Sequence, residues 1–359
     1  MSNKRIAYID ILEVIAIYFI CFIHYPILRT NWFCNFIDCL AYTGVIVFLM
    51  VNGALLFNKE FDLKKHLKKM LSLAIGLVCW EVISIFYFAN LYHLDVNTIK
   101  INDAISYMLG GIRWTMPTGH FWFIITLLAI YSIFPILKMV FDNEKYGRKF
   151  LLFFVGYSLV FNFLVNDLNT LQLLFSKLIG NFTPVEWSLL NKYSILSNDR
   201  IYYSLTLFII GGLLHKYLYV DKKVIKNQKL VGVFFILLGW CLLYISKGIH
   251  TGFTGSDFTN LPGAYGRICA VILGIGWFLS FVNVRDFKLK IIEVISKNTL
   301  GIFYLHCLFL GAISYYLYPY IYPCCLSNVI KSIIVLFLSL LICVLAEQAK
   351  NIFNMRITK

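Results

Sequence analysis

Ten apolar stretches follow one another along this chain of 359 residues, each predicted to cross a bilayer. The hydrocarbon core of a membrane is about 30 Å thick, which an apolar helix of roughly 20 residues spans. Backbone polar groups in lipid must be satisfied internally, which a helix achieves by itself. The stretches are Ile6–Leu28, Asp38–Phe57, Met70–Leu91, His120–Phe141, Phe150–Val165, Tyr202–Leu218, Leu230–Ser246, Gly263–Val282, Thr299–Leu317 and Ser327–Glu347. The sequence therefore predicts an all-α integral membrane protein, with about ten transmembrane helices in one bundle.

Basic residues collect in every second connection between these stretches and at both ends of the chain. Lys and Arg next to membrane spans are retained on the cytoplasmic side. We therefore expect both termini in the cytoplasm. The long connections Tyr92–Gly119 and Asn166–Ile201 then lie on the outer side, where the apolar segment Ile101–Ile112 could lie along the membrane interface.

The composition excludes a soluble domain, because 60% of the residues are hydrophobic and only 14% are charged. A net charge of +14 would suggest nucleic acid in a soluble chain. Here the basic loops face anionic lipid headgroups, so membrane lipids and not nucleic acid are the expected partners. No cysteine pair has the spacing of a zinc site, so no metal is expected. We expect a single membrane domain over residues 1–359, with no separate soluble domain.

The first stretch carries three titratable side chains, Asp10, Glu13 and His24. Charged or titratable groups at membrane depth are costly, which makes each a functional candidate. Eleven residues separate Glu13 from His24, which returns a helix to within ~20° of the same face. Asp10 lies on that face one turn earlier. This face is predicted to present two carboxylates near the cytoplasm and an imidazole ~16 Å further out. The alternative is that His24 is a hydrogen-bonded packing residue.

Two further histidines lie in later stretches. His120 opens the fourth stretch, at a depth similar to that of His24. Two histidines near one membrane face could serve as general base and orienting partner for a hydroxyl nucleophile. Alternatively, His120 beside Trp122 only anchors the span at the interface. His306 lies nearer mid-depth in the ninth stretch, and its neighbour Tyr304 points to a different face.

Cationic groups are the remaining candidates. A cluster of lysines precedes the third stretch: Lys64, Lys65, Lys68 and Lys69. Such a cluster could hold the phosphates of a cytosolic nucleotide-like donor, or it could serve only topology and lipid contact. Arg267 begins the eighth stretch from the outer side, where it could face a cavity or reach the interface. His93 and His250 lie in outer loops with no motif around them, so we expect both to tolerate replacement.

Four segments, in this order, resemble the acyltransferase-3 family of integral membrane acyltransferases, which modify surface polysaccharides. They are Tyr8–Leu12 leading to Phe22–His24, the run Val47–Phe57, the segment Gly119–Phe123 with Tyr131 and Pro135–Leu137, and Ser296–His306. The chain is most similar to the shorter branch that includes enterobacterial common antigen O-acetyltransferases, without a fused esterase-like domain. It departs from the family pattern where Glu13 replaces the usual Arg, and where Lys65 and Lys68 replace an Arg-x-x-Arg motif.

The resemblance implies an O-acetyltransferase of the cell membrane, in a bacterium the cytoplasmic membrane. It would move acetyl from cytosolic acetyl-CoA, a donor substrate and not a bound cofactor, to a hydroxyl of a surface or lipid-linked polysaccharide. The expected catalytic residues are His24, His120, Asp10 and Glu13. The expected substrate-binding residues are Trp122, Tyr304, His306, Arg267, Lys65, Lys68 and Lys69. The alternatives are a transporter or flippase for a polysaccharide intermediate, and a membrane partner that anchors other enzymes.

Overall fold

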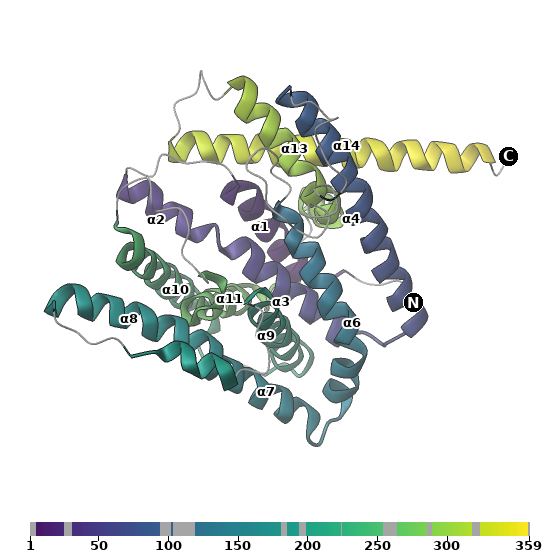
Figure 1. Ribbon diagram of the computed structural model, residues 1–359. Coiled ribbons are helices and arrows are strands. Elements are labelled where there is room, and N and C mark those ends of the chain that lie inside the picture. Colours follow the sequence, from purple (N-terminus) through teal and green to yellow (C-terminus); the bar gives the residue numbers. More distant parts are fainter. Residues whose placement is uncertain are drawn as a thin grey trace.

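A computed structural model describes most of the chain as helices packed into a bundle (Figure 1). The described residues are 5–24, 31–93, 102, 119–180, 185–193, 199–223, 225–253, 264–285, 289–317 and 324–357. No strand occurs among them, so the prediction of an all-α fold is confirmed. The expected interfacial segment Ile101–Ile112 lies outside the described residues, apart from Asn102.

Each of the ten predicted stretches coincides with one helix or with consecutive helical segments. The first four are α1 (Ala7–Ile23), α2 (Trp32–Leu40) with α3 (Thr43–Phe57), α4 (Leu63–Leu91), and η2 (Gly119–Phe121) with α6 (Trp122–Asp142). The fifth combines α7 (Gly147–Ser158), the π-helical η3 (Leu159–Phe163) and α8 (Leu164–Ile179). The last five are α9 (Asp199–Leu214) with η5 (His215–Val220), α10 (Gln228–Thr251), η6 (Ala264–Gly266) with α11 (Ile268–Phe281), α13 (Thr299–Leu317) and α14 (Cys325–Ile357). The short helices η4 (Trp187–Tyr193) and α12 (Lys290–Lys297) lie in connections.

Eight helical segments within the described ranges are long and apolar enough to cross a membrane. The helix α11 is apolar but shorter, and α1 has 17 residues. The chain is therefore a multi-pass helical membrane protein. That all ten stretches cross the bilayer, and that both termini are cytoplasmic, stay predictions.

Helix α1 lies inside the bundle, where it contacts α3, α11, α13 and α14 (Figure 1). Tyr8, Leu12, Ala16 and Ile17 are completely buried. A helix that is apolar on most of its circumference is covered by neighbours on most sides. Helix α1 is therefore an interior helix of the bundle.

Glycines allow α3 and α9 to pack with their backbones in contact. A Cβ atom on Gly53 would lie 1.8 Å from the carbonyl oxygen of Phe208, and one on Gly211 would lie 1.9 Å from that of Met50. Close approach through small residues is a usual way for membrane helices to pack, because lipid provides no hydrophobic drive for their association. Only glycine fits at these two positions.

The second stretch begins earlier than predicted. It was expected to start at Asp38, but helix α2 starts at Trp32. The side-chain oxygen of Asn31 accepts a hydrogen bond of 2.8 Å from the backbone N–H of Phe33. Asn is a favoured N-cap residue, because its side chain satisfies a backbone donor of the first helical turn.

The fifth stretch ends later than predicted. It was expected to stop at Val165, before a polar connection over Asn166–Ile201, but the helix continues to Ile179. The side chains of Asn166 and Asp167 bond to the backbone just before and at the start of α11. These two polar residues therefore form a helix-packing contact and do not start a loop.

Candidate active site

Three histidines from three separate helical segments meet in the bundle. His24 is the C-cap of α1, His120 lies in η2, and His306 lies in α13. The ring centroids are 6.1 Å apart for His24 and His120, 5.3 Å for His24 and His306, and 5.1 Å for His120 and His306. The structure thus brings the two candidate catalytic histidines side by side, and it adds His306, which was expected nearer mid-depth. We call these three residues the histidine cluster.

The members of the histidine cluster differ in their exposure. His24 is exposed, whereas His120 is 5% exposed and His306 is completely buried. The ring of His120 packs on Phe121 at 3.9 Å and on Phe303 at 5.6 Å between centroids. An apolar wall therefore surrounds two of the imidazoles, and His24 is the exposed member of the cluster.

The backbone of α13 orients His306. Its Nδ1 atom lies 2.6 Å from the carbonyl oxygen of Phe303, and its Nε2 atom lies 3.3 Å from the Sγ atom of Cys307. A carbonyl only accepts, so Nδ1 carries the proton and Nε2 keeps its lone pair. The thiol of Cys307 can then donate a weak hydrogen bond to Nε2. His306 is consequently held in one tautomer and one orientation.

Part of the histidine cluster also offers donor atoms for a metal ion. The ligand atoms of His120, His306 and Cys307 all lie within 4.8 Å of one another. Imidazole and thiolate are the usual ligands of zinc, and catalytic zinc sites have three protein ligands. Sequence spacing does not reveal this set, because His120 lies far from the other two along the chain. The absence of a metal site stays a prediction.

Trp122 lies two residues from His120 but turns toward a different group of side chains. Its ring is half-buried and lies 6.4 Å from Tyr203 and 6.2 Å from Tyr265. The guanidinium of Arg200 lies over the ring, 5.3 Å from its centroid. Trp122 thus belongs to an aromatic group next to the histidine cluster and does not enter it.

Tyr304 and His306 lie on different faces of α13, as their spacing predicted. The ring of Tyr304 stacks on Trp80 of α4, with centroids 5.6 Å apart and planes 10° from parallel. Tyr304 is 5% exposed, and no described residue bonds to its hydroxyl. It therefore packs α13 against α4, beside the histidine cluster.

Asp10 lies near the start of α1, far from the histidines. Its carboxylate forms an ion pair with Arg5 at 2.5 Å and accepts a hydrogen bond of 2.9 Å from the hydroxyl of Ser296. Through these contacts Asp10 connects the start of α1 to Arg5 before it and to Ser296 in α12. Asp10 is therefore already engaged by a cation and a hydroxyl.

Glu13 also lies away from His24. It lines a cavity of 280 Å³ together with Asp10 and Lys59. At a rise of 1.5 Å per residue, the eleven residues between Glu13 and His24 correspond to about 16 Å. The structure thus separates the four expected catalytic residues into two places, with His24 and His120 at one end of α1 and the carboxylates toward the other.

The three expected donor-binding lysines lie in the first two turns of α4. Lys65 forms an ion pair with Asp62 at 3.1 Å, and its side chain is 86% exposed. Lys68 is also exposed. The Nζ atom of Lys69 donates a hydrogen bond of 3.2 Å to the hydroxyl of Tyr131. All three lysines are therefore exposed, and Lys69 also contacts α6.

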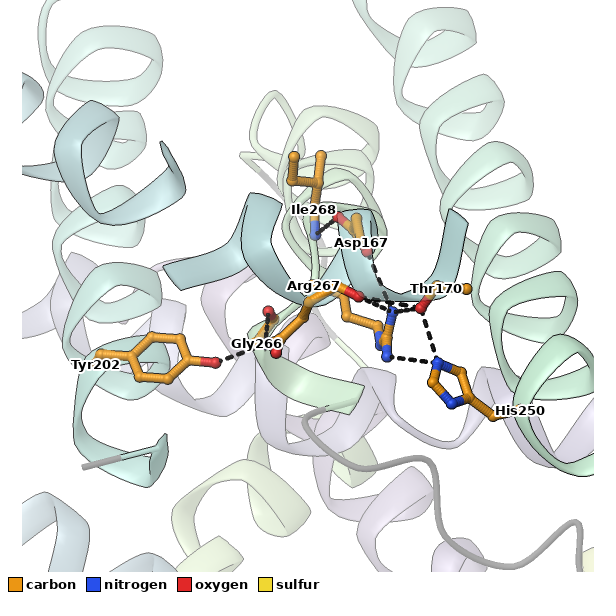
Figure 2. A network of polar contacts seen from close by, with 8 residues as sticks. Asp167, Thr170, Tyr202, His250, Gly266, Arg267 and Ile268 are labelled. Carbon is orange, nitrogen blue, oxygen red and sulfur yellow. Dashed lines mark hydrogen bonds and ion pairs between the residues drawn. The ribbon is translucent and has the colours of Figure 1, made fainter. Parts of the chain in front are cut away.

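Arg267 lies in a separate polar network, which Figure 2 shows from close by. It is 2% exposed. Its Nη1 atom donates to the backbone oxygen of Asn166 at 3.0 Å and to the hydroxyl of Thr170 at 2.5 Å, and it lies 3.4 Å from the carboxylate of Asp167. These groups of α8 hold Arg267 inside the protein, so its side chain does not extend to the protein surface.

The same network contains His250, which was expected in an outer loop with no motif around it. The Nε2 atom of His250 lies 2.9 Å from the hydroxyl of Thr170 and 3.4 Å from the Nη2 atom of Arg267 (Figure 2). The expectation that His250 lies in a loop is therefore wrong, because it belongs to helix α10; its tolerance of replacement by Ala stays a prediction. It lies in the last turn of α10, where the three helices α8, α10 and α11 share these contacts.

A buried ion pair, which sequence reasoning missed, joins α2 to α10. The Nζ atom of Lys247 lies 3.1 Å from the carboxylate of Asp38, and Lys247 is completely buried. Lys247 also lies over the ring of Tyr42, 5.4 Å from its centroid. The sequence did contain a sign of this ion pair, because Asp38 and Lys247 lie at the outer ends of two predicted stretches.

The fold and the histidine cluster together define a multi-pass helical membrane protein in which an exposed imidazole lies beside two buried ones. The chain matches a family model described as an acyltransferase domain over residues 6–348. It belongs to the acyltransferase-3 family, which confirms the resemblance found in the sequence, and it is accordingly an acyltransferase. No curated protein and no solved structure matches the chain.

Proposed function

We propose that this protein transfers an acetyl group from cytosolic acetyl-CoA to a hydroxyl of a surface or lipid-linked polysaccharide. The observation that carries the proposal is the histidine cluster, in which the exposed His24 is backed by two buried imidazoles. Transfer to oxygen requires removal of a proton, and imidazole is the side chain that most often does this near neutral pH.

His24 acts as the general base in this proposal. As the sugar hydroxyl attacks the carbonyl carbon of the thioester, His24 takes the hydroxyl proton and a carbon–oxygen bond forms. The tetrahedral intermediate then collapses, the carbon–sulfur bond breaks, and the departing sulfur receives the proton from His24. The imidazole returns to its starting state, so no other reactant is consumed.

His120 and His306 support His24 in different ways. His120 lies beside His24 and can stabilise the charge that develops on the carbonyl oxygen or orient the acceptor. His306, which the sequence suggested as a substrate-binding residue, is completely buried, and Phe303 fixes its ring orientation. We assign it the role of a positioning residue for the other two rings.

The aromatic group around Trp122 is suited to an acceptor sugar. Trp122 is half-buried, and Tyr203 and Tyr265 lie near its ring. Aromatic rings offer apolar faces on which the C–H faces of a sugar can pack. Arg200, over the same ring, adds donors for sugar oxygens. An acceptor held here would contact Trp122, which is two residues from His120 in the sequence.

Replacement of His24 by Ala tests the proposal. General-base catalysis contributes about 10²–10⁴-fold, so acylation of the surface glycan should fall by that factor. Mass spectrometry of glycans from cells with the wild-type protein, the variant or no protein gives the measurement. His93→Ala is the matched control, because His93 follows the end of α4, away from the histidine cluster.

Two results would contradict the proposal. Wild-type acylation by the His24→Ala variant would remove His24 from the chemistry. Movement of a lipid-linked sugar across the membrane by the wild-type protein, without any acyl-CoA consumed, would identify a flippase instead.

A further inference from the structure

A cavity of 690 Å³ opens between the end of α3, the end of α6, the start of α7 and η5. Four cationic side chains line it: Lys59, Lys138, Arg148 and Lys216. Two acidic side chains, Glu60 and Asp142, also line it, so cations outnumber acidic groups in its lining. We call it the basic cavity. Its lysines belong to the connections that the charge distribution places on the cytoplasmic side.

Acidic neighbours hold three of the cations in place. The Nζ atom of Lys138 lies 2.5 Å from Asp142, and that of Lys216 lies 2.9 Å from Asp221. Arg148 forms an ion pair of 3.3 Å with Glu144. Side chains that are already ordered lose less conformational entropy when they bind an anion. The basic cavity therefore presents ordered cationic side chains, three of which exchange an acidic partner for an incoming anion.

Lys59 differs from the other three cations, because no ion pair within the described ranges involves it. Burial lowers the pKa of Lys59, and the positive charge of Lys69 lowers it further, while Glu13 opposes this effect. Burial lowers a lysine pKa because it disfavours the charged form, and a nearby negative charge opposes this effect. A bound anion would supply the missing negative charge.

Aromatic side chains complete the lining of the basic cavity. Phe57 and Phe141 stack with centroids 4.7 Å apart, and Phe61 is 37% exposed. The guanidinium of Arg148 lies 5.5 Å from the centroid of Phe141. Exposed aromatic rings and Arg planes are surfaces on which nucleobases stack. Phe57 and Phe141 are buried, so Phe61 is the ring that could stack on a base, next to cations that could bind phosphates.

We propose that the basic cavity binds the adenosine 3′,5′-bisphosphate end of the acyl donor. The inference rests on the proposed function, in which the donor is acetyl-CoA. Lys59 also lines the 280 Å³ cavity that contains Glu13. The thioester arm would pass Lys59, enter that smaller cavity and follow α1 toward His24. The distance along the helix from Glu13 to His24 is about 16 Å.

This assignment moves the donor phosphates away from the lysines that the sequence suggested. Lys65 and Lys68 are exposed, and Lys65 already pairs with Asp62. Exposed lysines gain little from an ion pair because water screens the charge. We assign these two residues to contact with lipid headgroups instead.

Binding of adenosine 3′,5′-bisphosphate to the full-length protein in phosphatidylcholine nanodiscs tests the site. The double variant Lys138→Gln/Lys216→Gln should bind it about a hundredfold more weakly, since each lost charge-assisted contact costs about tenfold in affinity. Lys216→Gln by itself should weaken binding of the bisphosphate less, and it replaces the double variant in the test if that variant does not fold. Lys223→Gln, an exposed neighbour outside the cavity, is the matched control and should bind normally. Lys65→Gln/Lys68→Gln should also bind normally.

The outcomes separate this inference from the proposed function. Normal binding by Lys138→Gln/Lys216→Gln, with a loss in Lys65→Gln/Lys68→Gln, would overturn the basic cavity and leave the acyltransferase mechanism intact. Failure of the wild-type protein to bind acetyl-CoA would overturn both. Loss of bisphosphate binding when phosphatidylglycerol is added to the nanodiscs would identify the cavity as a lipid-headgroup site and refute the inference.

Discussion

Replacement of Lys247 by Met should destabilise the protein by about 3–5 kcal/mol, because removing one partner of a buried ion pair leaves an uncompensated charge. Lys247 is completely buried, and its Nζ atom lies 3.1 Å from the carboxylate of Asp38. Met has nearly the length of Lys, so the substitution removes charge without opening a large cavity. The carboxylate of Asp38, itself 4% exposed, would then have lost its counterion.

The loss of stability converts into a measurable temperature. An unfolding entropy of about 2.1 cal/mol/K per residue amounts to roughly 0.75 kcal/mol/K for a chain of 359 residues. The melting temperature of Lys247→Met should therefore fall by about 4–7 °C. Helices that stay formed in detergent reduce this entropy, which makes the shift larger. Intrinsic fluorescence during heating of the detergent-solubilised protein gives the measurement.

A double-mutant cycle shows whether the pair itself is responsible. Neutral side chains in place of a buried ion pair are often tolerated, so Asp38→Asn/Lys247→Met should melt closer to the wild type than Lys247→Met does. Lys65→Met, which breaks an exposed pair, is the control and should not shift the melting temperature measurably. The reasoning is refuted if Lys247→Met melts like the wild type, or if the shifts of the two single variants simply add.

Three further outcomes are expected, one from the charge distribution of the sequence and two from the structure. A cysteine introduced at Asn169 should react with a membrane-impermeant thiol reagent added outside the cell and one at Asn227 should not, and the reverse pattern would invert the topology. Gly53→Ala should lower the melting temperature, because its Cβ atom would overlap the backbone of α9; an unchanged value would mean that the helices do not pack this closely. His250→Ala should lower the melting temperature while His93→Ala leaves it unchanged, since only His250 belongs to the network of Figure 2; equal values for both would contradict this.

Much of the helical framework could be predicted, since each span obeys a local rule. Stretches such as Met70–Leu91 and Thr299–Leu317 reappear as helices because the need to bond the backbone internally acts on every apolar segment separately. The end of the fifth stretch was predicted wrongly, because polar residues there bond across helices. Asn166 and Asp167 looked like the start of a loop, but their partners at the start of α11 keep them in a helix.

The histidine cluster could be predicted only in part. The positions of His24 and His120 at the outer ends of their stretches placed them at similar depth, and the structure puts their rings 6.1 Å apart. His306 looked deeper, because its depth was counted along a straight span. Its approach to both rings depends on how α13 is offset along its axis against α1, which no local pattern encodes.

The sequence by itself determined that this chain is a helical membrane protein of the acyltransferase-3 family, and which side chains carry charge at membrane depth. Bilayer thickness and charge bias act on one segment at a time, so they can be read without a structure. Only the tertiary structure decided that Lys247 forms an ion pair with Asp38, and Arg267 with Asp167. These ion pairs depend on the rotation and axial offset of each helix, which close packing between neighbouring helices determines.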